Sequence, residues 1–318
     1  MNIDLERLKQ GNRRALAKAI TLIESKREQD REKSQDVLEQ LLPNTGKSIR
    51  IGITGIPGVG KSTFIESFGM FLVNQGKKVA VLAVDPSSPI AGGSILGDKT
   101  RMELLSREEN AFIRPSPSEG ALGGVAQKTR ETMLLCEAAG YDVIIVETVG
   151  VGQSEYEVAS MVDFFLVLMM PNAGDELQGI KKGIMELADS LIINKCDGES
   201  INLANKTKSQ YQSAVNLLHY TSFWTPRVMT CSSVEKNGMD AIWGMIVDYY
   251  FMAQEGETFN KKRSRQNIEW MRRLMHELVD MRINSTTEIK TILPQLRAQV
   301  TNGSTTPYVA AKKVIDLL

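Results

Sequence analysis

An uninterrupted phosphate-loop pattern, GxxxxGK[ST], occupies residues 55–62 as Gly-Ile-Pro-Gly-Val-Gly-Lys-Ser. The strand-like run Ser48–Thr54 precedes it and the helix-compatible run Ser62–Asn74 follows it, which is the context that the motif requires. A glycine-rich turn without a ligand is the alternative that this spacing and context disfavour. The pattern therefore predicts a nucleotide-binding strand–loop–helix unit in a doubly wound, mostly parallel α/β sheet.

Each residue type in this loop has a separate task. Glycines let the loop curl until successive backbone N–H groups point at a phosphate. The Lys61 ammonium adds positive charge near the β and γ oxygens, and the Ser62 hydroxyl is a candidate Mg²⁺ ligand. The predicted phosphate-binding residues are Gly55, Pro57, Gly58, Val59, Gly60, Lys61, Ser62 and Thr63.

A second pattern, NKxD, appears downstream as Asn194-Lys195-Cys196-Asp197 and predicts that the base is guanine. The Asp197 carboxylate can accept two hydrogen bonds, from N1–H and from the 2-amino group of guanine. Adenine lacks that pair of donors, so ATP would leave the carboxylate unpaired. Asn194 and Lys195 would brace the loop and cover the base. Four letters alone are weakly specific, but these directly follow the apolar run Ser190–Ile193, at the expected end of a parallel strand.

Carboxylates that follow other expected strands are candidates for the Mg²⁺ site. Asp85 begins an Asp-Pro-Ser-Ser-Pro segment after the second strand, and a turn-forming Asp-Pro is its alternative role. Glu147 begins Glu-Thr-Val-Gly where many GTPases carry DxxG, and could reach Mg²⁺ through water or orient the attacking water. A cap on the next turn is the alternative for Glu147. Gly150 would let the backbone approach the γ-phosphate.

Three further assignments carry weaker signals. Asp98, in the glycine-rich loop 92–99, is either a metal ligand on a mobile segment or the cap of a following helix. Gln153 lies three residues beyond Gly150, so its role in orienting water stays open against that of a simple loop amide. Cys231-Ser232-Ser233 closes the last expected strand, and backbone N–H groups there, with Ser232 and Ser233 as the candidates, could contact guanine O6.

The balance of charge excludes several classes of function. The 318 residues contain 38 basic and 38 acidic side chains, so no electrostatic case exists for nucleic-acid or membrane binding. The three cysteines are scattered without CxxC spacing and suit a reducing compartment. The first twenty residues resemble neither a signal peptide nor a typical transit peptide, and the longest apolar run, Phe164–Pro171, is too short to span a membrane. We expect a cytoplasmic protein.

The chain is predicted to divide into three zones: a helical arm over residues 1–46, a nucleotide-binding domain over 47–253, and a helical extension over 254–318. Short, nearly continuous apolar runs in the middle zone are typical of parallel strands covered by helices on both faces. The expected strands are Ile49–Thr54, Val79–Val84, Tyr141–Glu147, Phe164–Met169, Ser190–Ile193 and Arg227–Cys231. Helical tails of this kind either pack on a partner or fold back on their own domain, and the pattern leaves both open. The expected tail helices are Asn267–Met281, Thr287–Val300 and Pro307–Leu318.

An ordered set of motifs resembles the MeaB/ArgK (MMAA-type) P-loop GTPases of the SIMIBI class. The motifs are GITGIPGVGKST, AVDPSSP, SILGDKTRM, ETVGVGQSE, NAGDELQGIKKGIMELAD and NKCD, and the resemblance covers nearly the whole chain. Each motif is widely shared, whereas the ordered set is highly specific.

The resemblance implies a G-protein chaperone that gates cofactor loading of an adenosylcobalamin-dependent acyl-CoA mutase, usually methylmalonyl-CoA mutase, and protects or reactivates it. It implies GTP/GDP and Mg²⁺ as ligands and a homodimer formed through the C-terminal helices. The family's metal carboxylates fall on Asp85, Asp98 and Glu147. A further mobile switch corresponds to Asn172–Lys182, with Lys181 a candidate for phosphate contact; a solvated helix face is its alternative.

Intrinsic hydrolysis is expected to be slow because no arginine finger is identifiable and Gln153 is displaced. Three rival functions remain open. A kinase of transport proteins would use ATP, against the NKxD pattern. A metal-insertion GTPase would ordinarily need clusters of cysteine or histidine residues as metal ligands. A nucleotide-gated binding module would hydrolyse GTP only incidentally.

Overall fold

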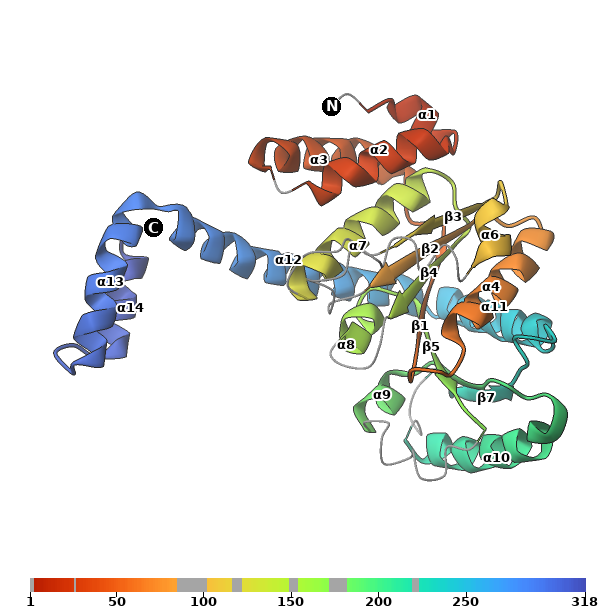
Figure 1. The fold of residues 1–318 in the computed structure, drawn as a ribbon. Helices are drawn as coiled ribbons and strands as arrows, with labels where there is room; N and C mark the ends of the chain where they lie inside the picture. Colours follow the sequence, from red (N-terminus) through yellow and green to blue (C-terminus); the bar gives the residue numbers. More distant parts are fainter. Residues whose placement is uncertain are drawn as a thin grey trace. The chain divides into compact units, whose positions relative to one another are not determined.

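The computed structural model describes residues 3–25, 27–84, 102–115, 122–148, 154–171, 182–218 and 223–318. Its first compact unit, Met1–Phe259, is built around one seven-stranded sheet (Figure 1). The strands lie in the order β3-β2-β4-β1-β5-β6-β7, and all neighbours are parallel. They are β1 (Ile49–Gly55), β2 (Val79–Val84), β3 (Ala111–Arg114), β4 (Val143–Thr148), β5 (Phe164–Met169), β6 (Ser190–Ile193) and β7 (Arg227–Thr230).

The predicted parallel α/β fold is confirmed, and the six expected strands appear with shifts of at most two residues at their ends. β3 was missed. It has only four residues, Ala-Phe-Ile-Arg, and pairs on one side alone, with β2, at the edge of the sheet. A run this short carries too little periodicity to be recognised as a strand from its sequence.

Helices cover both faces of the sheet, because alternate residues of each strand point to opposite sides. On one face, Ile51 and Ile53 of β1 pack in a cluster with apolar residues of α4, α6 and α11. On the other face, Ile144 and Val146 of β4 pack with α2, α3, α7, α8 and α10. The helices of this unit are α1 (Leu5–Lys9), α2 (Arg13–Glu24), α3 (Glu28–Leu41), α4 (Lys61–Asn74), α6 (Glu103–Arg107), α7 (Leu122–Ala138), α8 (Ser154–Ala159), α9 (Lys182–Leu187), α10 (Ile201–Leu218) and α11 (Met239–Glu255), with 3₁₀ turns at Leu42–Asn44 and Gly198–Ser200.

This topology places a ligand crevice beside β1. The loop after β1 leads into α4 on one face, whereas the helix that follows β4 in the chain, α8, lies on the other face. Neighbouring strands whose following helices lie on opposite faces leave a crevice at their carboxyl ends, which is where open α/β sheets bind ligands. Helix α8 packs closely on β1 at Gly52. A Cβ atom at this position would lie only 2.8 Å from side-chain atoms of Val158 and Phe165, so a larger residue would not fit.

The N-terminal helices belong to the same compact unit and share its core. Leu16 and Ile20 of α2 are fully buried in the cluster that includes the sheet. A buried ion pair fixes the connection into β1: Arg50 Nε lies 2.9 Å from Glu137 Oε1, and the other Glu137 oxygen accepts from the Gly46 N–H at 2.8 Å. At the end of α2, the Lys128 ammonium donates to the Ile23 carbonyl.

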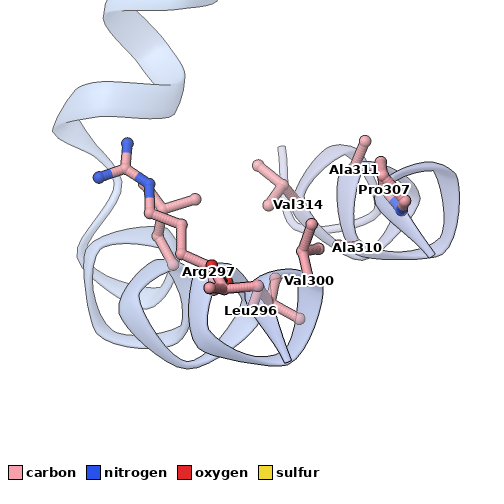
Figure 2. Close-up of a pocket in the computed structure, with 9 residues that line it drawn as sticks. Leu296, Arg297, Val300, Pro307, Ala310, Ala311 and Val314 are labelled. Atoms are coloured by element: carbon pink, nitrogen blue, oxygen red, sulfur yellow. Dashed lines mark hydrogen bonds between the residues drawn. The ribbon is translucent and has the colours of Figure 1, made fainter. Parts of the chain in front are cut away.

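In the second compact unit, Asn260–Leu318, the secondary-structure elements are all helices joined by short turns. It contains most of α12 (Thr258–Ser285), followed by α13 (Thr287–Thr301) and α14 (Pro307–Ile315), which pack together through Ile289, Leu296, Ala310 and Val314. A largely apolar pocket of about 400 Å³ lies between α13 and α14, and Figure 2 shows the residues that line it. Among the described residues, no helix is long and apolar enough to cross a membrane.

Candidate functional site

The phosphate loop joins the end of β1 to the first turn of α4. Gly58 and Gly60 have φ angles of 82° and 90°, a left-handed conformation that glycine adopts without strain. Gly60 is the N-cap of α4 and supplies no side-chain cap, so the first N–H groups of the helix have no partner within it. Pro57, Gly58 and Thr63 are exposed and Ser62 is half-buried. The loop thus presents open N–H donors and the positive end of a helix dipole, the arrangement that binds phosphate.

Lys61 lies folded against this loop. Its ammonium donates to the Gly55 carbonyl at 2.7 Å and to the Ile56 carbonyl at 3.4 Å. Burial lowers the pKa of Lys61, and the nearby Glu147 and Glu155 carboxylates oppose that shift. Glu147 is 5% exposed and Glu155 fully buried, so two interior carboxylates act on the one lysine of the phosphate loop.

Sequence reasoning did not single out Glu155, although it lies in the quoted ETVGVGQSE segment. A usable signal was its spacing from Val158, three residues later, which puts both on one face of a helix. Val158 packs over Gly52 in β1, and Glu155 lies one turn earlier on the same helix. Because α8 starts from the carboxyl ends of the strands, its first turn lies near the phosphate loop.

Glu147 occupies the next-to-last position of β4, between β1 and β2. It pairs in register with Ile53 on one side and Ala83 on the other. The next residue, Thr148, shares a 2.7 Å hydrogen bond between its hydroxyl and that of Thr54, which leads into the phosphate loop. The Glu147 carboxylate and the Ser62 hydroxyl are hard oxygen donors of the kind that Mg²⁺ prefers, so their chemistry fits the expected ion.

Asn194 connects the base motif to the phosphate loop. Its Nδ2 donates to the Val59 carbonyl at 2.9 Å, and its Oδ1 accepts from the Ser233 hydroxyl at 2.7 Å and from the Ser233 N–H at 3.2 Å. Lys195, with a positive φ of 58°, donates to the Gly58 carbonyl at 2.8 Å. The two loops that the sequence predicts for phosphate and base are therefore joined directly in the fold.

Asp197 is held by the loop after β7. The Ser232 hydroxyl donates to Asp197 Oδ2 at 2.6 Å, and the Asp197 side chain is half-buried. The Ser232 N–H donates to the Asn237 carbonyl at 3.2 Å, and the Ser233 N–H to Asn194. Both backbone groups expected to meet guanine O6 thus have internal partners here, and the two serine side chains orient the NKxD residues.

Several predicted site residues lie outside the described residues: Asp85, Asp98, Gly150, Gln153 and Lys181. Within the described ranges, no three His, Cys, Asp or Glu side chains gather to hold a metal ion. The three cysteines are free thiols. The pocket on α13 and α14 contains none of the predicted nucleotide residues.

Comparison with known proteins identifies the same family over most of the chain. Residues 16–288 match the family model described as methylmalonyl-CoA mutase-associated GTPase MeaB. The GTPase ArgK of Escherichia coli (strain K12) is 48% identical over 99% of this chain and 95% of its own length. A mitochondrial methylmalonic aciduria type A homolog of Mus musculus is 45% identical over 96% of this chain and 76% of its own.

A solved structure is also similar throughout. A crystal structure described as a LAO/AO transport system kinase is 42% identical, with a TM-score of 0.76, and the match covers 98% of this chain and 95% of the other. Similarity at this level, over nearly the full length of both chains, covers the phosphate loop, the base motif and the helical C-terminal unit together.

Proposed function

Because the chain belongs to the MeaB family of methylmalonyl-CoA mutase-associated GTPases, we propose that it is the G-protein chaperone of an adenosylcobalamin-dependent acyl-CoA mutase. GTP hydrolysis would gate cofactor loading and protect or reactivate that mutase, with methylmalonyl-CoA mutase as the expected client. The family match over residues 16–288 carries this proposal. The contacts that join the phosphate and base loops support it, because one guanine nucleotide bound across both loops could regulate a partner.

In this proposal the described residues divide the work on the nucleotide. The N–H groups of the phosphate loop and the Lys61 ammonium bind the β- and γ-phosphates, which requires Lys61 to leave the Gly55 carbonyl. Asp197 recognises guanine, with Asn194 and Lys195 bracing the loop. Ser62 and Glu147 would hold Mg²⁺ directly or through water, and the ion would neutralise charge on the phosphate oxygens. The proposed site also includes four residues that lie outside the described ranges: Asp85, Asp98, Gly150 and Lys181.

The mutase is expected to accelerate hydrolysis, since slow intrinsic turnover leaves room for a partner to order the loops around the phosphates. We expect saturable stimulation of about tenfold or more when steady-state GTP hydrolysis is titrated with the organism's own adenosylcobalamin-dependent mutase. An unrelated protein at the same concentrations is the control. A slow rate that no mutase changes would contradict the chaperone assignment and leave a GTPase with another client.

The Glu147 carboxylate is proposed to act in hydrolysis rather than in nucleotide affinity. Glu147→Gln keeps the side-chain shape and removes its charge, so we expect the rate of a single turnover to fall by about 100-fold while GTP still binds. Glu157→Gln is the matched control, because Glu157 is a half-buried carboxylate on α8. Rapid-quench measurement at saturating Mg²⁺ and GTP tests this. Full hydrolysis by the Glu147→Gln variant, with an unchanged Mg²⁺ requirement, would remove Glu147 from the mechanism.

The proposed assembly is a homodimer formed through the C-terminal helices. Four side chains at helical spacing on α12 are about half-exposed: Ile268, Met271, Met275 and Leu278. An apolar row of this kind is covered by another protein surface more often than by water. Sedimentation of the full chain as a monomer would contradict the proposal.

We also place the protein in the cytoplasm, with neither nucleic acid nor membrane among its partners, in line with its balanced charge and its free cysteines.

A further inference from the structure

Ser67 lies on the buried face of α4, one and a half turns beyond the phosphate loop. Its hydroxyl donates to the Ser233 carbonyl at 2.6 Å, although the two residues are 166 positions apart in the chain. Both residues are buried, at 7% and 4% exposure, so this bond is shielded from bulk water. A buried helical serine commonly bonds to a carbonyl one turn earlier in its own helix. Ser67 instead reaches across to the loop after β7.

This bond closes a ring of contacts between the phosphate and base loops. The Val59 carbonyl accepts from Asn194, and Asn194 accepts from the Ser233 hydroxyl. The Ser233 carbonyl then accepts from Ser67, and α4 leads back to Val59 through Lys61. The loop that contains Ser232 and Ser233 is consequently fixed from two sides, by the base motif and by the helix of the phosphate loop.

We propose that Ser67 is a positioning residue for guanine selectivity: it sets the base-reading loop against the helix that begins at the phosphate loop. The partner of Asp197 in that loop is Ser232, whose hydroxyl fixes one carboxylate oxygen at 2.6 Å. Holding the adjacent Ser233 carbonyl therefore also fixes where the Asp197 carboxylate points. Because a nucleotide bridges both loops, the spacing between them decides whether the base meets Asp197 with the phosphates in place. This inference rests on Asp197 reading guanine, as in the proposed function.

The test compares guanine with a base that lacks the 2-amino group. GDP and IDP differ only in that donor, so the ratio of their dissociation constants reports the Asp197 contact. In Ser67→Ala we expect this ratio to shrink by about threefold to tenfold, the effect of one misplaced hydrogen bond. Ser67→Thr keeps the hydroxyl and should restore most of the ratio. A general loss of stability would weaken GDP and IDP alike and leave the ratio unchanged.

Ser190→Ala is the matched control, because the Ser190 hydroxyl makes the same kind of bond, to the Arg227 carbonyl at 2.8 Å, at the opposite end of β6 and β7. Its GDP/IDP ratio should equal that of the wild type. An unchanged ratio in Ser67→Ala, with thermal melting showing a folded protein, would overturn the proposal. So would an equal reduction in Ser190→Ala. If the wild type itself does not distinguish GDP from IDP, the role of Asp197 in the proposed function is refuted. This outcome distinguishes failure of the proposed function from failure of the Ser67 proposal.

Discussion

Lys61→Ala is expected to cost the protein at least about 100-fold in GTP affinity and to abolish measurable hydrolysis. Charge-assisted hydrogen bonds are each worth about 1.5–3 kcal/mol, and a tenfold change in affinity corresponds to about 1.4 kcal/mol. Lys61 is the cation within the phosphate loop, and its ammonium lies at that loop, where it donates to the Gly55 carbonyl that it must leave to reach the phosphates. Its removal also takes the ammonium away from the buried Glu147 and Glu155 carboxylates, whose negative field would then face the triphosphate.

Equilibrium binding of a fluorescent GTP analogue, together with phosphate release, measures this effect. Lys47→Ala is the matched control, since it removes the same charge from an exposed position just before β1. A melting curve for each variant separates loss of binding from loss of fold. Retention of wild-type affinity in Lys61→Ala would exclude the phosphate loop as the nucleotide site.

Asp197→Asn should change the preferred base of the nucleotide from guanine to xanthine. The carboxylate accepts from both donors of guanine, whereas the amide can accept from N1–H and donate to the 2-oxo group of xanthine. We expect GTP affinity to fall by about 100-fold, with XTP becoming the preferred nucleotide, because a site built for a hydrogen-bonding group discriminates strongly against its absence. The Ser232 hydroxyl can donate to the remaining amide oxygen, so the loop can keep its shape.

Competition among GTP, XTP and ATP for binding measures the exchange. Asp240→Asn changes an exposed carboxylate at the start of α11 and should leave all three affinities unaltered. ATP competing on equal terms with GTP in the wild type would contradict the reading of Asp197. It would also favour the transport-kinase function that the sequence left open.

The fold was largely predictable, because parallel strands buried on both faces leave continuous apolar runs. Phe164–Met169 and Val79–Val84 matched their strands at both ends. The edge strand β3 escaped prediction because a four-residue strand that pairs on one side has neither length nor a repeating pattern. The tail helix predicted to begin at Asn267 begins at Thr258 instead. Its first turns escaped prediction because their charged residues show no apolar periodicity.

The local parts of the site were predictable for a different reason. The phosphate loop and NKxD are contiguous segments whose residue types follow from their ligands. The contacts between segments were not predictable: Ser67 and Ser233 find each other only after the sheet has formed, as do Glu155 and Lys61. A single sequence does not reveal which of its many serines or glutamates the fold will bring together. Roles for Asp85, Asp98 and Lys181 remain predictions.

The position of β1 in the sheet has a consequence for how the chain folds during synthesis. β1 pairs only with β4 and β5, and the contact between Thr54 and Thr148 spans 94 residues. On the ribosome, the phosphate loop therefore emerges long before the strands that fix it. Non-local pairing of this kind slows folding and keeps apolar strands uncovered meanwhile. Until the middle of the protein has been translated, the apolar β1 therefore lacks both of the strands that cover its edges.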